Sequence, residues 1–255
     1  MDPTLASRCS ATAGYRGRRP DRNTMSRSSK RGPFTDLLIQ QFPDWLAYFE
    51  ANCPFRRYGQ LEYHRQTLAR RSEFDDVVAA IADEQFCDSL YRTLQAWGIG
   101  SRASKLRPFA EFCAVIRQQS QLLARLDAVA VDDPGLDVPD VGERLWRLIE
   151  QLPVVDNLAT LVPVTKALHH LLPDLVVPID REYTQTFFGW ENPQFQYGQR
   201  VCFSRAFAEF AEIARTVRPA QYIGSGWNSC RTKVIDNAIV GLIQYAKAQV
   251  RAGAG

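Results

Sequence analysis

The 255-residue chain contains no apolar run near the roughly 18 residues that a membrane-spanning helix needs. Its six cysteines form no CxxC pair, and no HExxH motif or Cys/His cluster accompanies its three histidines. No apolar segment follows the early arginines, which disfavours a secretory signal. These absences predict a cytoplasmic protein with no membrane partner, no metal site and no other cofactor.

Charge is distributed unevenly along the chain. The total is 31 Lys and Arg against 28 Asp and Glu, but residues 1–33 hold eight of the cations and only two of the anions. This segment is therefore +6, and residues 34–255 are −3. Because the segment has almost no aliphatic side chains to offset the loss of chain entropy, we expect a disordered basic tail. It would bind a polyanion through counterion release, or it is an upstream extension of a chain that starts at Met25.

Helical periodicity dominates residues 34–255, where apolar residues recur at intervals of three and four. Strand-like alternation is too short anywhere to support a sheet, and no internal repeat is visible. The pattern predicts a mainly α fold, built as a single compact multi-helix domain. The expected helices cover about 34–49, 74–97, 109–126, 141–149, 161–171, a stretch beginning at 180, 200–217 and 232–250.

Polar side chains follow a helical spacing in the middle of the chain. Lys166, His169 and His170 stand at i, i+3 and i+4, on the face opposite an apolar stripe. Asp180 is well placed to cap the next helix, with Tyr183 one turn further on. An amine facing a carboxylate suits imine-forming chemistry, because the lysine must lose its proton to attack and the acid then moves protons. The alternative is an ordinary amphipathic surface helix followed by a structural cap.

Residues 162–190 resemble part of the helix-hairpin-helix DNA glycosylases of the 8-oxoguanine type. The Thr-Lys-Ala sequence around Lys166 is similar to the lysine-bearing end of that family's hairpin, and Pro178, Ile179 and Asp180 resemble its Pro-Val-Asp turn. The resemblance implies that Lys166 is the nucleophile and Asp180 the catalytic acid or base. The same stretch also resembles a segment of uncharacterised bacterial proteins, which implies no activity.

A second constellation spans residues 224–241. A Gly-Ser-Gly loop precedes a helix and leaves backbone amides free to hold a phosphate. Lys233 and Asn237 then share one polar helix face, and Trp227 and Asn228 stand at the mouth of the loop, as an indole and an amide do in base or small-ligand pockets. The alternative is a solvated face with an ion pair inside one helical turn.

Tyrosines and a histidine alternate with arginines in residues 56–71, a mixture suited to single-stranded nucleic acid. The same arginines would equally solubilise a loop.

Two functions therefore remain open. The first is a protein that binds DNA or RNA and processes a base through a covalent imine. The second is a non-enzymatic regulatory or defence-associated module that holds a protein partner or small ligand, which the −3 charge of residues 34–255 favours.

The first function assigns each candidate residue a role. The catalytic candidates are Lys166, His170 and Asp180, and the ligand-binding candidates are His169, Arg181, Tyr183, Trp227, Asn228, Lys233 and Asn237.

Overall fold

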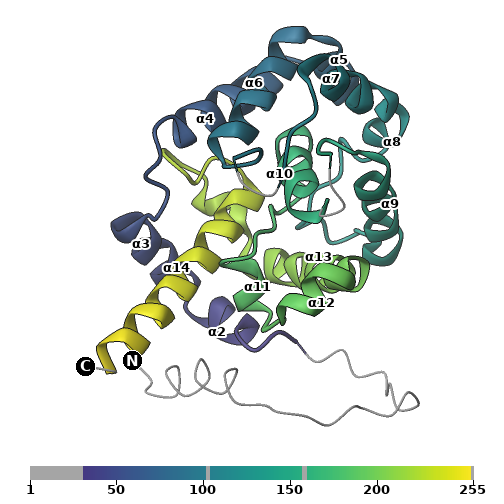
Figure 1. The fold of residues 1–255 in the computed structure, drawn as a ribbon. Helices are drawn as coiled ribbons and strands as arrows, with labels where there is room; N and C mark the ends of the chain where they lie inside the picture. Colours follow the sequence, from purple (N-terminus) through teal and green to yellow (C-terminus); the bar gives the residue numbers. More distant parts are fainter. Residues whose placement is uncertain (1–30, 102–103, 157–159, 254–255) are drawn as a thin grey trace.

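The computed structural model describes residues 31–101, 104–156 and 160–253 (Figure 1). Most of the expected basic tail thus lies outside the described residues. Its last residues are held against the helical body, where the Gly32 backbone N–H donates to both carboxylate oxygens of Glu209, at 2.7 and 3.0 Å. The Thr35 hydroxyl donates to the same carboxylate at 2.5 Å. Residues 31–35 therefore form a polar attachment to the body.

The mainly α prediction is confirmed. Across the described ranges the chain forms helices joined by loops and contains no β-strand, with one isolated bridge between Leu106 and Val155. No helix there is both long and apolar enough to cross a bilayer. The α-helices are α2 (Thr35–Gln40), α3 (Phe42–Asn52), α4 (Gln60–Arg71), α5 (Val77–Ala82), α6 (Glu84–Ala96), α7 (Phe109–Gln118), α8 (Ser120–Ala124), α9 (Val138–Gln151), α10 (Leu161–Leu171), α11 (Thr184–Phe187), α12 (Asn192–Tyr197), α13 (Gln199–Val217) and α14 (Arg231–Gly253), and a 3-10 helix, η2, spans Pro219–Tyr222.

The last two long helices begin and end close to where the sequence predicts them, whereas three expected helices are each divided in two. The expected helix at 74–97 is split by capping aspartates. Asp76 accepts the backbone N–H of Ala79 at 2.8 Å, and Asp83 accepts that of Phe86 at 2.7 Å. Because an aspartate that caps a helix holds its own backbone in an extended conformation, Asp83 ends α5 and starts α6.

Helix α4 is the longer of two α-helices that the predicted ranges leave out, the other being α12. Its buried residues are polar: His64, Thr67 and Arg71. The Thr67 hydroxyl bonds the hydroxyls of Ser89 and Thr93 on α6 at 2.6 and 2.8 Å. A helix that buries a polar face has no apolar stripe in its sequence. The arginine-rich stretch 56–71 therefore does not predict a helix by periodicity and is equally compatible with a loop.

Helix α14 is the central element of the core. It is buried from Thr232 to Ile243 and packs most extensively along α3 (Figure 1). The two helices cross at Gly241, where an added Cβ atom would overlap the backbone carbonyl oxygen of Trp45. The close approach brings the first turns of α14 to the centre of the molecule.

This crossing predicts that Gly241→Ala is strongly destabilising. The new methyl group must push α14 away from α3, and overpacking of this kind costs about 3 kcal/mol of unfolding free energy. Gly224→Ala is the matched control, since a Cβ atom there has no neighbour within 4 Å, and we expect a change of less than about 0.5 kcal/mol. Urea unfolding followed by circular dichroism compares the two variants. Equal stability of both would show that the helices do not cross at Gly241.

Candidate functional site

A cavity of about 510 Å³ opens between the start of α10, the start of α14 and four loops. Its aromatic lining comes from Phe55, Trp97, Tyr183, Phe195 and Trp227. The volume falls in the range of small-ligand sites. The charged side chains that line it are Arg57, Lys166, Asp180, Arg181, Glu182, Lys233 and Asp236.

Lys166 reaches this cavity from α10. Its ammonium nitrogen lies 5.8 Å from the centre of the Trp97 ring. Within the described ranges no hydrogen bond or ion pair engages Nζ. Burial lowers the pKa of Lys166, and the negative charges of Asp180 and Asp236 oppose that effect only in part. The amine is therefore neutral more often than that of an exposed lysine, which is the form that attacks an electrophile.

Contrary to the prediction from sequence, Asp180 is not the N-cap of the next helix: α11 begins four residues later, after its N-cap Tyr183, and Asp180 instead fixes the turn that precedes it. Its Oδ1 accepts the backbone N–H groups of Tyr183 and Thr184 at 2.6 and 3.3 Å, and its own N–H donates to the Thr184 hydroxyl at 3.2 Å. These contacts fix the carboxylate just before α11. Among the described residues Oδ2 has no hydrogen-bond partner, so this oxygen is free to meet a ligand.

The tertiary structure brings Lys166 and Asp180 to the same cavity, as their spacing in the sequence predicts. The two groups interact electrostatically, since the charge of Asp180 favours the protonated form of Lys166. No ion pair joins them in the described part of the chain. An unpaired amine beside a fixed carboxylate retains its capacity to react.

Lys233 is held very differently from Lys166. It is only 1% exposed, and its Nζ donates to Asp236 Oδ2 at 2.5 Å and to Asn237 Oδ1 at 2.8 Å. Asn237 donates in turn to Asn228 Oδ1 at 2.7 Å, and Asn228 donates to Glu50 at 2.8 Å. The spacing of this ion pair is as the sequence predicts, but the helix face that carries it is buried and not solvated.

Aromatic rings surround the Lys233 ammonium group. Its nitrogen lies 4.9 Å from the ring centre of Phe55, 5.0 Å from Trp227 and 5.7 Å from Trp97. Contact with aromatic faces stabilises a desolvated cation. The same rings form a wall of the cavity on which a planar ligand can stack.

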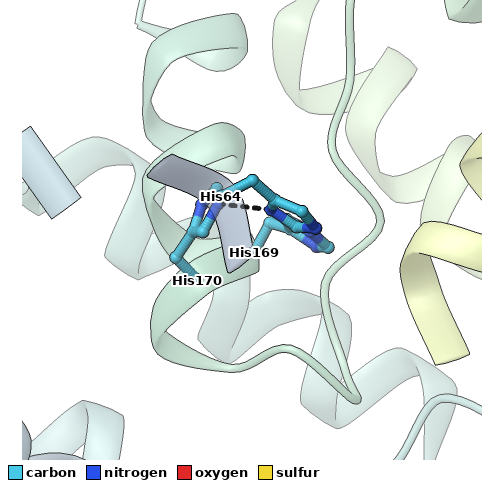
Figure 2. Close-up of side chains that lie close together, drawn as sticks. All are labelled: His64, His169 and His170. Atoms are coloured by element: carbon cyan, nitrogen blue, oxygen red, sulfur yellow. Dashed lines mark hydrogen bonds between the residues drawn. The ribbon is translucent and has the colours of Figure 1, made fainter. Parts of the chain in front are cut away.

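The histidines lie behind this wall and do not line the cavity. His64, His169 and His170 are fully buried, and their rings converge on one another (Figure 2). His64 stacks on Trp227 with ring centres 5.6 Å apart, and His170 meets Trp97 edge-on at 4.9 Å. The structure thus places His170, a catalytic candidate, where it supports the cavity wall.

The remaining candidates divide in the same way. Those that line the cavity are Lys166, Asp180, Arg181, Tyr183, Trp227 and Lys233, and those behind it are His169, His170, Asn228 and Asn237. Sequence reasoning did not assign Phe55, Arg57, Trp97 or Asp236 to the site. Two of them left a signal: Asp236 stands three residues from Lys233, and Arg57 lies in the basic and aromatic stretch 56–71. Phe55 and Trp97 come from loops, and no local sequence pattern shows that these loops lie close together.

The chain matches no protein-family model, and neither a curated protein nor a solved structure resembles it at a significant level. The resemblance to helix-hairpin-helix glycosylases stays a prediction from sequence.

The buried histidines predict a loss of stability in mild acid. Burial, the largest effect, lowers the pKa of His64 and His169 well below the ordinary value and that of His170 to about 4. In the unfolded chain histidine binds a proton near pH 6.5. Below about pH 6.5 the unfolded state holds more protons than the folded state. The unfolding free energy is therefore highest above about pH 6.5 and decreases towards pH 4, by roughly 3 kcal/mol for His170 alone.

Urea unfolding at several pH values, in the presence of a chelator, tests this expectation. Carboxylates contribute to the same pH range, so the comparison is with His170→Asn, which should show a shallower decline. Parallel curves for the two proteins would contradict a buried neutral His170.

Proposed function

We propose that the protein binds DNA or RNA and processes a base, with Lys166 as the amine nucleophile and Asp180 as the group that moves protons. One observation carries the proposal: a fixed carboxylate lines the same aromatic-walled cavity as a lysine amine that forms no ion pair with any described side chain. The sequence resemblance of residues 162–190 to base-excision glycosylases supports the same reaction class.

The shape and lining of the cavity suit a nucleobase taken out of its stack. Phe55, Trp97 and Trp227 offer aromatic faces, and base stacking on such faces stabilises binding by about 1–3 kcal/mol per base. Arg57 and Arg181 line the cavity and are exposed, as groups that contact a flanking phosphate must be. A planar base inside the cavity would stack on the aromatic rings, and a phosphate outside it would contact the arginines.

Exposed aromatic side chains near the cavity favour a polymer over a small free metabolite. Tyr58 is 98% exposed and directly follows Arg57, which lines the cavity. Tyr197 is 82% exposed and comes two residues after Phe195, another lining residue. Proteins that bind single strands stack successive bases on aromatic side chains of this kind.

The reaction uses the two groups in sequence. Neutral Lys166 Nζ forms a bond to the sugar carbon C1′ while the bond from C1′ to the base nitrogen breaks, and the base leaves with that electron pair. Asp180 carries a proton from the new ammonium nitrogen to the departing base. A second proton, taken from water and delivered by Asp180, goes to the ring oxygen as its bond to C1′ breaks and the iminium C=N bond forms.

Borohydride trapping tests this mechanism. With damaged, abasic and single-stranded oligonucleotides we expect a protein–DNA adduct, because hydride converts the iminium carbon to a stable amine. Lys166→Met keeps the buried stem of the side chain and should abolish the adduct, whereas Lys105→Ala removes an exposed amine and should retain it. Asp180→Asn should slow adduct formation by about 10²- to 10⁴-fold.

Urea unfolding first establishes that Lys166→Met folds. An adduct of undiminished yield in that variant would assign trapping to other amines and overturn the role of Lys166. If the wild type binds the oligonucleotides but never forms an adduct, the result supports the non-enzymatic alternative.

Binding itself is tested at the exposed aromatics. Tyr58→Ala and Tyr197→Ala should each weaken the affinity for a single-stranded oligonucleotide by about 5- to 100-fold, the loss of one stacking contact. Val78→Ala on α5 removes an apolar side chain of 37% exposure that does not line the cavity, and should leave affinity unchanged. Fluorescence anisotropy at fixed salt measures all three. Equal affinities throughout would exclude these tyrosines from the contact.

A further inference from the structure

Three imidazole rings from two segments that are distant in the sequence lie close together in the interior. His64 lies on α4, and His169 and His170 lie on α10 (Figure 2). One nitrogen from each ring lies within 4.8 Å of the other two. The closest pair, His64 Nδ1 and His170 Nε2, is 2.9 Å apart. For tetrahedral zinc with metal–nitrogen bonds of about 2.0–2.1 Å, ligand nitrogens stand about 3.3 Å apart, a spacing between the 2.9 Å of the closest pair and the 4.8 Å within which all three lie.

The other nitrogen of each ring is already occupied. His170 Nδ1 bonds the Lys166 carbonyl oxygen at 2.8 Å, and His169 Nδ1 bonds the Val176 carbonyl oxygen at 3.0 Å. His64 Nε2 bonds the Ser229 hydroxyl at 2.7 Å. His169 and His170 are held as metal-binding histidines usually are, because a carbonyl oxygen keeps the proton on Nδ1 and leaves Nε2 free for a metal, and the Ser229 hydroxyl can accept from His64 Nε2 once a metal occupies Nδ1.

One nitrogen in the cluster has no partner. His169 Nε2 is buried, and no hydrogen bond satisfies it among the described residues. A buried polar atom without a partner is costly, so its presence needs an explanation such as a water molecule or an ion. A metal ion between the three rings would satisfy it and would also replace the contact between His64 and His170.

We propose that His64, His169 and His170 form a binding site for a zinc-like transition-metal ion. Three imidazole nitrogens without a carboxylate select such metals over Mg²⁺ and Ca²⁺, which require oxygen ligands. The sequence predicted no metal because the ligands follow no local spacing: His64 is 106 residues from His170. The nearby Lys233 is neutralised as a pair with Asp236, at 2.5 Å.

The metal would have a structural role. None of the three histidines lines the cavity, and the rings of Trp97 and Trp227 lie against them. Binding would join α4 to α10, the helix that carries Lys166, and so hold the cavity wall in place. The inference does not depend on the proposed activity.

Zinc binding by the chelator-treated full chain tests the site. We expect one Zn²⁺ per chain by competition with a chromophoric chelator and by elemental analysis, an increased Tm, and no effect of Mg²⁺. His64→Asn, His169→Gln and His170→Asn should each weaken zinc binding by about 100-fold or more, since even partners of metal ligands contribute 10- to 100-fold. Cys53→Ser, which removes a partly exposed thiol, should bind zinc like the wild type.

A measurement on the wild type keeps the proposal testable if the histidine variants do not fold. The chain has only three histidines, so its imidazole ¹⁵N resonances report this cluster alone. Zinc should shift Nε2 of His169 and His170 and Nδ1 of His64, and the proton that His64 Nδ1 donates to His170 should move to Nε2, opposite the Ser229 hydroxyl. Absence of a one-to-one complex, or binding that leaves these nitrogens unshifted, would overturn the site.

Discussion

The burial of the Lys233 charge is the constraint around which the site is built. Removing an ammonium group from water costs several kcal/mol unless a counter-charge and hydrogen bonds replace the solvent. Asp236 and Asn237 supply both from the same helix, and Asn228 extends the network to Glu50 on α3. The close crossing of α14 and α3 at Gly241 positions this network, so packing of the core and polarity of the cavity are linked.

This arrangement gives the two cavity lysines opposite properties. Lys233 is paired and surrounded by aromatic rings, so it serves as a fixed positive charge in the wall. Lys166 is desolvated and no described residue forms an ion pair with it, so its amine is the one available for reaction. The difference arises from position: Asp236 is one turn away from Lys233 on the same helix, whereas Asp180 reaches Lys166 only across the cavity.

Periodicity located the helices whose buried face is apolar. The bounds of α13 and α14 agree closely with the stretches in which apolar residues recur at helical spacing. It failed where polar groups determine the structure. Helix α4 buries His64 and Thr67, and Asp83 interrupts what periodicity alone would continue as one helix. Such features depend on hydrogen bonds to other helices or to backbone amides, and an apolar pattern carries no record of them.

The sequence by itself determined the helical class and the pairing of Lys233 within one helical turn, because these depend on contacts between near neighbours. It predicted that Lys166 and Asp180 face each other, and the tertiary structure placed both in the lining of one cavity. Only the tertiary structure decided which polar faces are buried. It placed His169 and His170 in the interior, brought His64 to them from 106 residues away, and put Phe55 and Trp97 in the cavity wall. Burial is the sum of contacts from many segments, so no single segment encodes it.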